Sequence, residues 1–292
     1  SGSKKEIRPV TIATYQVMTT RKGGVYAHLD LFDAIDWGLI IYDEVHLLPA
    51  PIFRFTADIQ SRRRLGLTAT LVREDGMEGE VFSLIGPKRF DVPWKEIESQ
   101  GYIAPADCVE VRVNLTEDER LAYATAEQED RYRYCSTTLT KHKVALALAN
   151  KHKDEQVLII GQYIDQIDKL AADLNVPIVK GDTPIKERER LFELYRTGEL
   201  KCLVVSKVAN FSVDLPDATV AIQVSGTFGS RQEEAQRLGR VLRPKSDGRS
   251  ARFYSIVARD TIDQDFAQNR QRFLAEQGYA YQIIDADEIL SA

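Results

Sequence analysis

The sequence predicts an α/β protein built on mostly parallel sheets. Short strand-like segments alternate with helical segments along most of the chain, and several of the strand-like segments are apolar at every position. Strands of that kind are buried on both faces, as in parallel sheets that crossover helices cover on both sides. With 292 residues, the chain is long enough for two domains, since single domains commonly span about 100 to 200 residues.

Composition excludes several classes of protein. The hydrophobic fraction of 43% and the charged fraction of 28% are typical of a globular protein, and no apolar run approaches the length of about 18 residues that a bilayer span requires. We find no secretory signal, and the 3 cysteines and 4 histidines lack disulfide or zinc spacing. We therefore expect a cytoplasmic protein without a membrane partner. The net charge of −5 opposes overall attraction to nucleic acid but is compatible with a local basic groove.

The first part of the chain, residues 1–105, is expected to form one domain. After a polar lead come a β-branched run at 10–14 and two apolar strands at 37–42 and 64–70. The strand at 37–42 is expected to be buried on both faces. The stretch from 92 to 105 is rich in Pro and Gly, which places the domain boundary there.

Residues 106–292 are expected to form a second domain in which strands and helices alternate regularly. The predicted strands are 108–113, 156–161, 177–179, 201–206, 219–224 and 251–257. The predicted helices are 116–134, 140–152, 164–174, a helix from Pro184 capped by Asp182 or Thr183, 232–242 and 262–275, and the end of the chain from Asp285 is expected to fray. Such alternation predicts right-handed crossovers between parallel strands.

Acidic residues follow the first apolar strand. Asp43 and Glu44 lie directly after it, at the end of the strand where open α/β sheets bind ligands. Nucleotide hydrolysis requires such a pair, because one carboxylate holds Mg²⁺ and the other orients and deprotonates the attacking water. The alternative is an acidic pair that faces solvent, which is common in α/β proteins. Thr68 and Thr70, at the end of the next strand, favour the first interpretation.

A helix that ends before Pro244 carries a stripe of polar side chains. Gln236, Arg240 and Arg243 recur at helical spacing and lie on one face. Two arginines one turn apart repel each other unless an anion lies before them, and planar guanidinium groups suit phosphate oxygens. A glycine inside a helix costs about 1 kcal/mol relative to alanine. The presence of Gly239 would be explained if another group approached the helix backbone closely at this position. The alternative is a solvated amphipathic helix.

Several segments together resemble the later motifs of superfamily 2 helicases. These segments are DEVH at 43–46, LTAT at 67–70, SKVANFSVDLP at 206–216 and QRLGRVLRPK at 236–245. REDG at 73–76 and the VPWKE segment are similar to the XPB branch of that superfamily. Because order and spacing match from about residue 10 to the end, the resemblance covers nearly the whole chain.

The resemblance implies a pair of RecA-like domains with ATP and Mg²⁺ in the cleft between them. The residues it places at the nucleotide are Asp43 as the Mg²⁺-linked carboxylate, Glu44 as general base, His46 as relay, Thr68 and Thr70 as coupling residues, Asp214 as ribose sensor or coupling carboxylate, Gln236, and Arg240 and Arg243 as arginine fingers.

The resemblance also implies that single-stranded or forked DNA crosses both domains. The residues it places at the DNA are Arg73, Glu74, Asp75, Gln162, Thr183, Ser206 and Lys207. The helical stretch at 117–135 occupies the place of the family's thumb. Arg62–Arg64 could form a phosphate patch, but before a strand such a run more often lies in a solvated loop.

One element of a helicase motor is missing from the sequence. The chain contains no Gly-Lys dipeptide and therefore no phosphate cradle of the G-x-x-x-x-G-K-[ST] type. We therefore expect the C-terminal portion of a helicase, with an incomplete first domain and no ATP turnover by this polypeptide alone. A partial sheet leaves apolar faces uncovered, so self-association is expected.

Three functions remain under consideration. The first is an ATP-driven DNA helicase or translocase of XPB type, moving 3′ to 5′ as the resemblance implies, in DNA repair or transcription. The second is a non-catalytic RecA-like module that binds DNA or a nuclease partner. The third is a translocase that moves duplex DNA without separating its strands.

Overall fold

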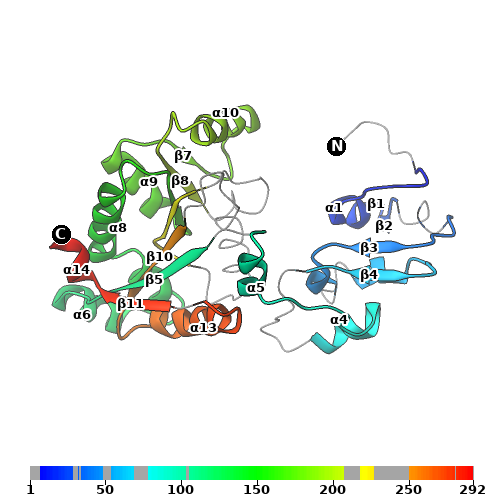
Figure 1. Cartoon of the computed structure of the whole chain (residues 1–292), viewed down its shortest axis with the longest axis horizontal. Helices are drawn as coiled ribbons and strands as arrows, with labels where there is room; N and C mark the ends of the chain where they lie inside the picture. The colour runs from blue at the N-terminus through cyan, green and yellow to red at the C-terminus, as the bar shows by residue number, and fades with distance from the viewer. Residues whose placement is uncertain are drawn as a thin grey trace. The chain divides into compact units, whose positions relative to one another are not determined.

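The computed structural model describes residues 7–28, 32, 34–48, 54–68, 78–102, 105–206, 218–226, 250–279 and 281–291. The chain divides into two compact units, Ser1–Asp91 and Val92–Ala292 (Figure 1). This division comes earlier than the boundary predicted at residue 105. The reason is that helix α5 (Trp94–Ser99) belongs to the second unit, where the backbone N–H of Lys95 donates to the carbonyl of Gln277 at 3.2 Å.

The first unit contains short elements. Its helices and strands are α1 (Tyr15–Thr19), β1 (Arg21–Lys22), β2 (Val25–Tyr26), β3 (Ile40–Tyr42), the 3-10 helices η1 (Val45–Leu47) and η2 (Phe55–Asp58), β4 (Arg64–Gly66) and α4 (Glu78–Ile85). Strands β3 and β4 pair in parallel, as predicted, whereas β1 and β2 form a separate antiparallel pair. The β-branched run at 10–14 is not a strand, since no described residue pairs with it and Ile12 is exposed.

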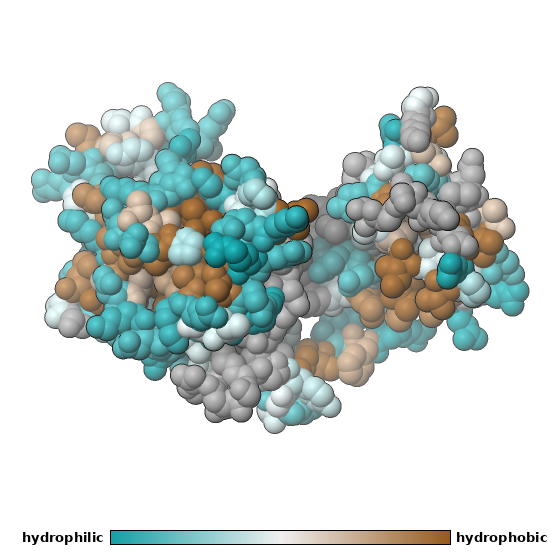
Figure 2. All heavy atoms as spheres, turned by 90° about the horizontal axis from the view of Figure 1, so that it is seen from above, coloured by the Kyte–Doolittle hydropathy of each residue, from teal (hydrophilic) through white to brown (hydrophobic). Residues whose placement is uncertain are grey.

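Among the described residues of the first unit, only one face of the β3–β4 pair is covered. Tyr42 is buried in a small core with Val45 and Leu48. Ile41 and Leu65 are register partners on the opposite face and are 54% and 45% exposed. The prediction that the strand at 37–42 is buried on both faces is therefore wrong, and the expected uncovered apolar face is present. Apolar side chains also reach the surface of this unit in Figure 2.

The second unit is organised around a seven-stranded sheet of order β11-β5-β10-β9-β6-β8-β7. Its strands are β5 (Ala106–Val113), β6 (Val157–Gly161), β7 (Ile178–Val179), β8 (Cys202–Ser206), β9 (Val220–Gln223), β10 (Ala251–Ala258) and β11 (Tyr281–Asp285). Every pairing between these strands is parallel, which confirms the predicted class. All residues of β6 are buried, because apolar clusters lie on both faces of the sheet.

Helices connect and cover these strands. Besides α5 they are α6 (Glu117–Thr125), α7 (Arg131–Ser136), α8 (Leu139–Lys151), α9 (Ile164–Leu174), α10 (Ile185–Arg196), α13 (Ile262–Glu276) and α14 (Ala286–Leu290). The single helix predicted at 116–134 is two helices, α6 and α7. Thr116 begins α6 with a capping box to Glu119. Neither Asp182 nor Thr183 caps α10, whose N-cap is Pro184.

The prediction of a frayed C-terminal end is wrong. β11 pairs with β5, and Asp285 begins α14 through a capping box with Glu288. Ala286 and Ile289 are each 6% exposed. Their burial holds the end of the chain on the second unit, which its acidic composition did not indicate. No helix among the described residues is long and apolar enough to cross a bilayer.

A buried ionic cluster joins several elements of the second unit. Lys141 of α8 and Asp263 of α13 form an ion pair at 2.6 Å, and both side chains are almost fully buried. The ammonium also donates to the carbonyl of Val224 at 3.3 Å, and Asp263 accepts from the backbone N–H of Ala258 at 2.9 Å. Buried charges persist only when they are paired and hydrogen-bonded in this way.

We expect Gly66→Ala to destabilise the first unit. A Cβ at this position would lie 2.8 Å from Val45 Cγ2, so the core must shift, at a cost of about 1 to 3 kcal/mol. Urea unfolding followed by Trp37 fluorescence, in a Trp94→Phe background, measures the loss. Gly38→Ala is the matched control, because a Cβ there meets nothing within 4 Å. Equal stability of the two variants would contradict this account of Gly66.

Candidate functional site

The strand ends of the first unit bring two predicted motifs together. Because β3 and β4 are parallel, the residues that follow them emerge at the same edge. The pairing continues past the strands. The backbone N–H of Val45 donates to the carbonyl oxygen of Leu67 at 3.0 Å, and the backbone N–H of Leu67 donates to the carbonyl oxygen of Tyr42 at 2.9 Å. The segments 43–46 and 67–68 therefore lie side by side.

Glu44, His46 and Thr68 form a linked set of side chains. His46 is 1% exposed, and its Nδ1 lies 2.9 Å from Thr68 Oγ1 and 3.4 Å from Glu44 Oε2. The Glu44 side chain remains 40% exposed, so it can reach a bound molecule while it contacts the histidine. Glu44 has a left-handed backbone, with φ 51° and ψ 47°, which is costly for a residue other than glycine. The chain turns sharply there, and the Glu44 carboxylate lies beside the ring of His46.

Asp43 is held by a residue that the sequence did not single out. The Tyr15 hydroxyl donates to the carbonyl oxygen of Asp43 at 2.9 Å, and the Asp43 carboxylate accepts from the backbone N–H of Glu44 at 3.0 Å. Burial, followed by the charges of Tyr42, Asp43 and Glu44, raises the pKa of Tyr15 to about 12. No pattern around Tyr15 pointed to the site, because the contact joins positions far apart in sequence.

The carboxylates of Asp43 and Glu44 could bind a magnesium ion that is also coordinated by the phosphates of a bound molecule. Mg²⁺ usually keeps several waters and takes one or two protein carboxylates besides the substrate's phosphates. Asp43 is exposed at the strand end, which meets that requirement. Among the described residues no group of three or more His, Cys, Asp or Glu side chains could hold a metal by itself. The donor set therefore fits a nucleotide-bound ion and offers no independent metal cage.

The second unit brings together three of the residues predicted to contact DNA. Gln162 follows β6, Ser206 ends β8, and Thr183 comes shortly after β7. These strands are neighbours in one parallel sheet, with Gly161 paired to Ser206, so all three residues lie at its carboxyl edge. Ser206 is 1% exposed.

The backbone donors of two of these residues are engaged within the unit. The N–H of Gln162 donates to Ser225 Oγ at 2.7 Å. The N–H of Thr183 donates to the carbonyl of Lys180 at 3.2 Å, and the Thr183 hydroxyl accepts from the N–H of Lys180 at 2.8 Å. The backbone N–H groups of Gln162 and Thr183 are therefore not available to a ligand.

The other predicted site residues lie outside the part of the chain that the structure describes. They are Thr70, Arg73, Glu74, Asp75, Lys207, Asp214, Gln236, Arg240 and Arg243. The helix predicted at 232–242 lies outside it as well. Their roles stay predictions from the sequence.

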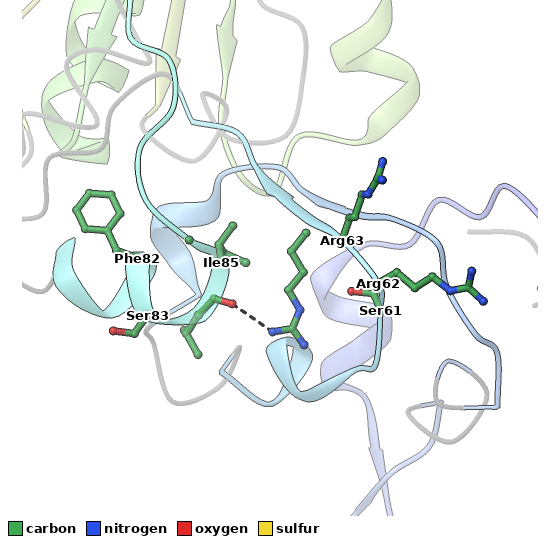
Figure 3. A pocket seen from close by; sticks show the side chains of 9 residues that line it. Ser61, Arg62, Arg63, Phe82, Ser83 and Ile85 are labelled. Atoms are coloured by element: carbon green, nitrogen blue, oxygen red, sulfur yellow. Dashed lines mark hydrogen bonds between the residues drawn. The ribbon is translucent and has the colours of Figure 1, made fainter.

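The arginine run Arg62–Arg64 does not converge on one point. These residues and the end of α4 line an open cavity of about 430 Å³, in which the labelled Arg62 and Arg63 side chains point in different directions (Figure 3). Arg62 pairs with Asp36 at 2.6 Å. Arg64 donates to the carbonyl of Leu84 at 3.2 Å, near the end of α4. Arg62 and Arg64 therefore make contacts within the first unit. The arrangement of the three side chains does not favour a shared phosphate site.

Comparison with protein families identifies the chain. A family model described as the ERCC3/RAD25/XPB C-terminal helicase matches residues 97–291. The chain belongs to this family. The "DNA 3'-5' helicase XPB" of Kineococcus radiotolerans is 73% identical over 99% of the chain and 52% of its own length. The protein of the same name from Mycobacterium tuberculosis is 68% identical over 99% of the chain and 53% of its own length. The chain thus spans about half the length of these curated relatives.

A more distant relative and a solved structure are also similar to the chain. The "General transcription and DNA repair factor IIH helicase/translocase subunit XPB/SSL2" of Saccharomyces cerevisiae is 34% identical over 94% of the chain and 34% of its own length. The structure of S. cerevisiae Dbp5 bound to RNA and ADP BeF3 has a TM-score of 0.58 and 16% identity, and covers 90% of the chain and 67% of that protein. At that identity the likeness shows the α/β fold alone.

We expect the contribution of Tyr15 to stability to disappear at high pH. Because the folded-state pKa lies above the ordinary value of 10, the protonated phenol is favoured by folding. The stabilisation is therefore complete below about pH 10 and is lost as the pH rises toward 12. A spectrophotometric titration of wild type minus Tyr15→Phe should show one phenol with a midpoint near pH 12. A midpoint near pH 10 would contradict the observed burial and hydrogen bond.

Proposed function

We propose that the native protein with this chain is an ATP-dependent DNA helicase or translocase of XPB type that moves 3′ to 5′. The observation that carries the proposal is the contact set of Glu44, His46 and Thr68 at the strand ends, within a chain of the ERCC3/RAD25/XPB family. In this proposal the unit Ser1–Asp91 supplies part of a first RecA-like domain, and the unit Val92–Ala292 forms the second.

Each residue at the β3 end has a chemical role in this proposal. Glu44 accepts the proton of the attacking water, because its carboxylate is partly exposed and oriented by the buried imidazole of His46. Thr68, hydrogen-bonded to the same ring, relays changes at the nucleotide to the β4 end. Asp43 would hold Mg²⁺, which neutralises charge on the phosphates when bound. Tyr15 fixes the backbone of Asp43.

The remaining nucleotide contacts are proposed from the sequence. Arg240 and Arg243 act as arginine fingers that stabilise charge on the γ-phosphate, beside Gln236. Asp214 senses the ribose or couples the nucleotide to DNA, and Thr70 shares the coupling role of Thr68. A planar guanidinium group can donate two hydrogen bonds to one phosphate. Arginine therefore suits this role better than lysine.

The proposed nucleic-acid substrate is single-stranded or forked DNA. The residues assigned to it are Arg73, Glu74, Asp75, Gln162, Thr183, Ser206 and Lys207. The common position of Gln162 and Thr183, both partly exposed, at one sheet edge supports this assignment, whereas Ser206 is 1% exposed and gives it no support. The name of the S. cerevisiae relative includes both transcription and DNA repair, which supports a role in one of these processes. The competing functions are a duplex translocase and a non-catalytic module that docks a nuclease.

Steady-state ATPase measurements on the complete native gene product test the proposal. We expect DNA-stimulated hydrolysis that Glu44→Gln lowers about 10²- to 10⁴-fold in kcat, as for loss of a general base. Arg240→Ala should lower kcat about 10³-fold or more with little change in nucleotide affinity. Glu189→Gln, in the exposed part of α10, is the matched control.

The outcomes separate the hypotheses. Unchanged turnover in Arg240→Ala removes that residue from the site, and an absence of DNA-stimulated hydrolysis in the wild type favours the non-catalytic module. Strand displacement from a forked substrate by the same protein distinguishes unwinding from movement along duplex DNA.

The polypeptide of residues 1–292 should also associate with itself through the uncovered face of β3 and β4. Leu39, Ile41, Leu65 and Leu67 expose apolar surface on these strands and the residues beside them, and its burial contributes about 25 cal/mol per Å². Sedimentation velocity should show concentration-dependent association that Ile41→Lys with Leu65→Lys abolishes. Leu121→Lys, at an exposed position of α6, is the control. A monodisperse wild-type monomer would exclude this association.

A further inference from the structure

Ser225 links two segments that are distant in sequence. It lies just beyond β9 and is 1% exposed. Its Oγ accepts a hydrogen bond from the backbone N–H of Gln162 at 2.7 Å and donates one to Gln166 Oε1 at 2.9 Å. The Gln166 amide in turn donates to the carbonyl of Ser136, the last residue of α7, at 2.6 Å. The result is a continuous hydrogen-bonded relay from α7 to the end of β6.

The relay fixes the turn that begins helix α9. Gln162 precedes this helix and Gln166 lies in its first turn, so one hydroxyl group holds both sides of the turn. Gln166 is 6% exposed and does not lie on the open surface. Removal of the Ser225 hydroxyl would leave the backbone N–H of Gln162 and the side-chain Oε1 of Gln166 without these partners, which is costly in a buried setting.

The residues on either side of Ser225 are held by other helices. Lys141 of α8 donates to the carbonyl of Val224 at 3.3 Å. Tyr132 of α7 donates to the carbonyl of Gly226 at 2.8 Å. The Ser225 hydroxyl is therefore supported on a backbone that cannot shift freely.

The position of Tyr132 also assigns it a structural role. Its side chain is 2% exposed and packs edge-on against the ring of Phe266, with 4.9 Å between the ring centroids. Burial raises the pKa of its hydroxyl. A buried ring of this kind cannot stack on a base. The exposed groups near the turn come from its neighbours, since Arg133 pairs with Asp165 at 3.2 Å.

We infer that Ser225 is a positioning residue for the DNA contact at Gln162, and that Gln166 transmits its effect to helix α7. The inference rests on the proposed function, because the DNA contact at Gln162 belongs to that proposal. The hydroxyl does not touch the strand. It sets the direction in which the Gln162 side chain leaves the carboxyl edge of the sheet, and α7 sets the position of the hydroxyl through Gln166.

Fluorescence anisotropy with a labelled single-stranded oligothymidine tests the inference in the complete native gene product. Ser225→Ala should raise the Kd for the oligonucleotide about threefold to tenfold, as for loss of one or two buried hydrogen bonds. Gln166→Leu, which removes the same relay from its other side, should weaken binding in the same direction. The Kd for ADP, measured in parallel, should not change in either variant.

Ser255→Ala is the matched control, because Ser255 is also 1% exposed but lies within β10. It should bind the oligonucleotide as wild type does. The inference is overturned if both Ser225→Ala and Gln166→Leu bind DNA normally, or if they weaken ADP and DNA binding equally. A wild-type protein that does not bind the oligonucleotide overturns the proposed function and the inference with it, whereas normal wild-type binding with unaffected variants overturns only the inference.

Discussion

Parallel strand pairing is the constraint on which the rest of this structure depends. It brings the carboxyl ends of neighbouring strands to one edge, and the predicted site residues Glu44, Thr68, Gln162 and Ser206 lie at or just after such ends. In the first unit His46 links Glu44 to Thr68 at this edge, and in the second Ser206 is paired with Gly161, the residue before Gln162. Parallel strands also need long crossover connections between them. Residues that meet at one sheet edge are therefore far apart along the chain.

The two units satisfy the burial requirement of parallel sheets to different degrees. β6 lies inside a seven-stranded sheet and is buried at every position. β3 has a similar apolar sequence but pairs only with β4 among the described strands, so Ile41 remains exposed. Local sequence is therefore not sufficient to determine burial, because burial depends on how many strands and helices surround a segment.

Buried polar groups determine how the second unit is assembled. The Lys141–Asp263 pair and the hydroxyl of Ser225 both lie beside the end of β9, where they join elements from three parts of the chain. Such groups contribute little net stability compared with apolar residues of the same volume, but a wrong arrangement leaves them unpaired. They consequently favour a single position for the residues that precede the predicted arginine segment.

The sequence alone determined the fold class, most strands of the second unit and the position of polar residues such as Glu44 and Gln162 just after strand ends. Helix α9, for example, runs from Ile164 to Leu174 as its periodicity predicts. These features are local, because hydrophobic periodicity and turn residues act over a few positions. The tertiary structure decided the contact of Tyr15 with Asp43, the relay through Ser225, the ordered end at β11 and α14, and the exposure of Ile41. Each of these depends on residues far apart in the chain, whose distances no local pattern specifies.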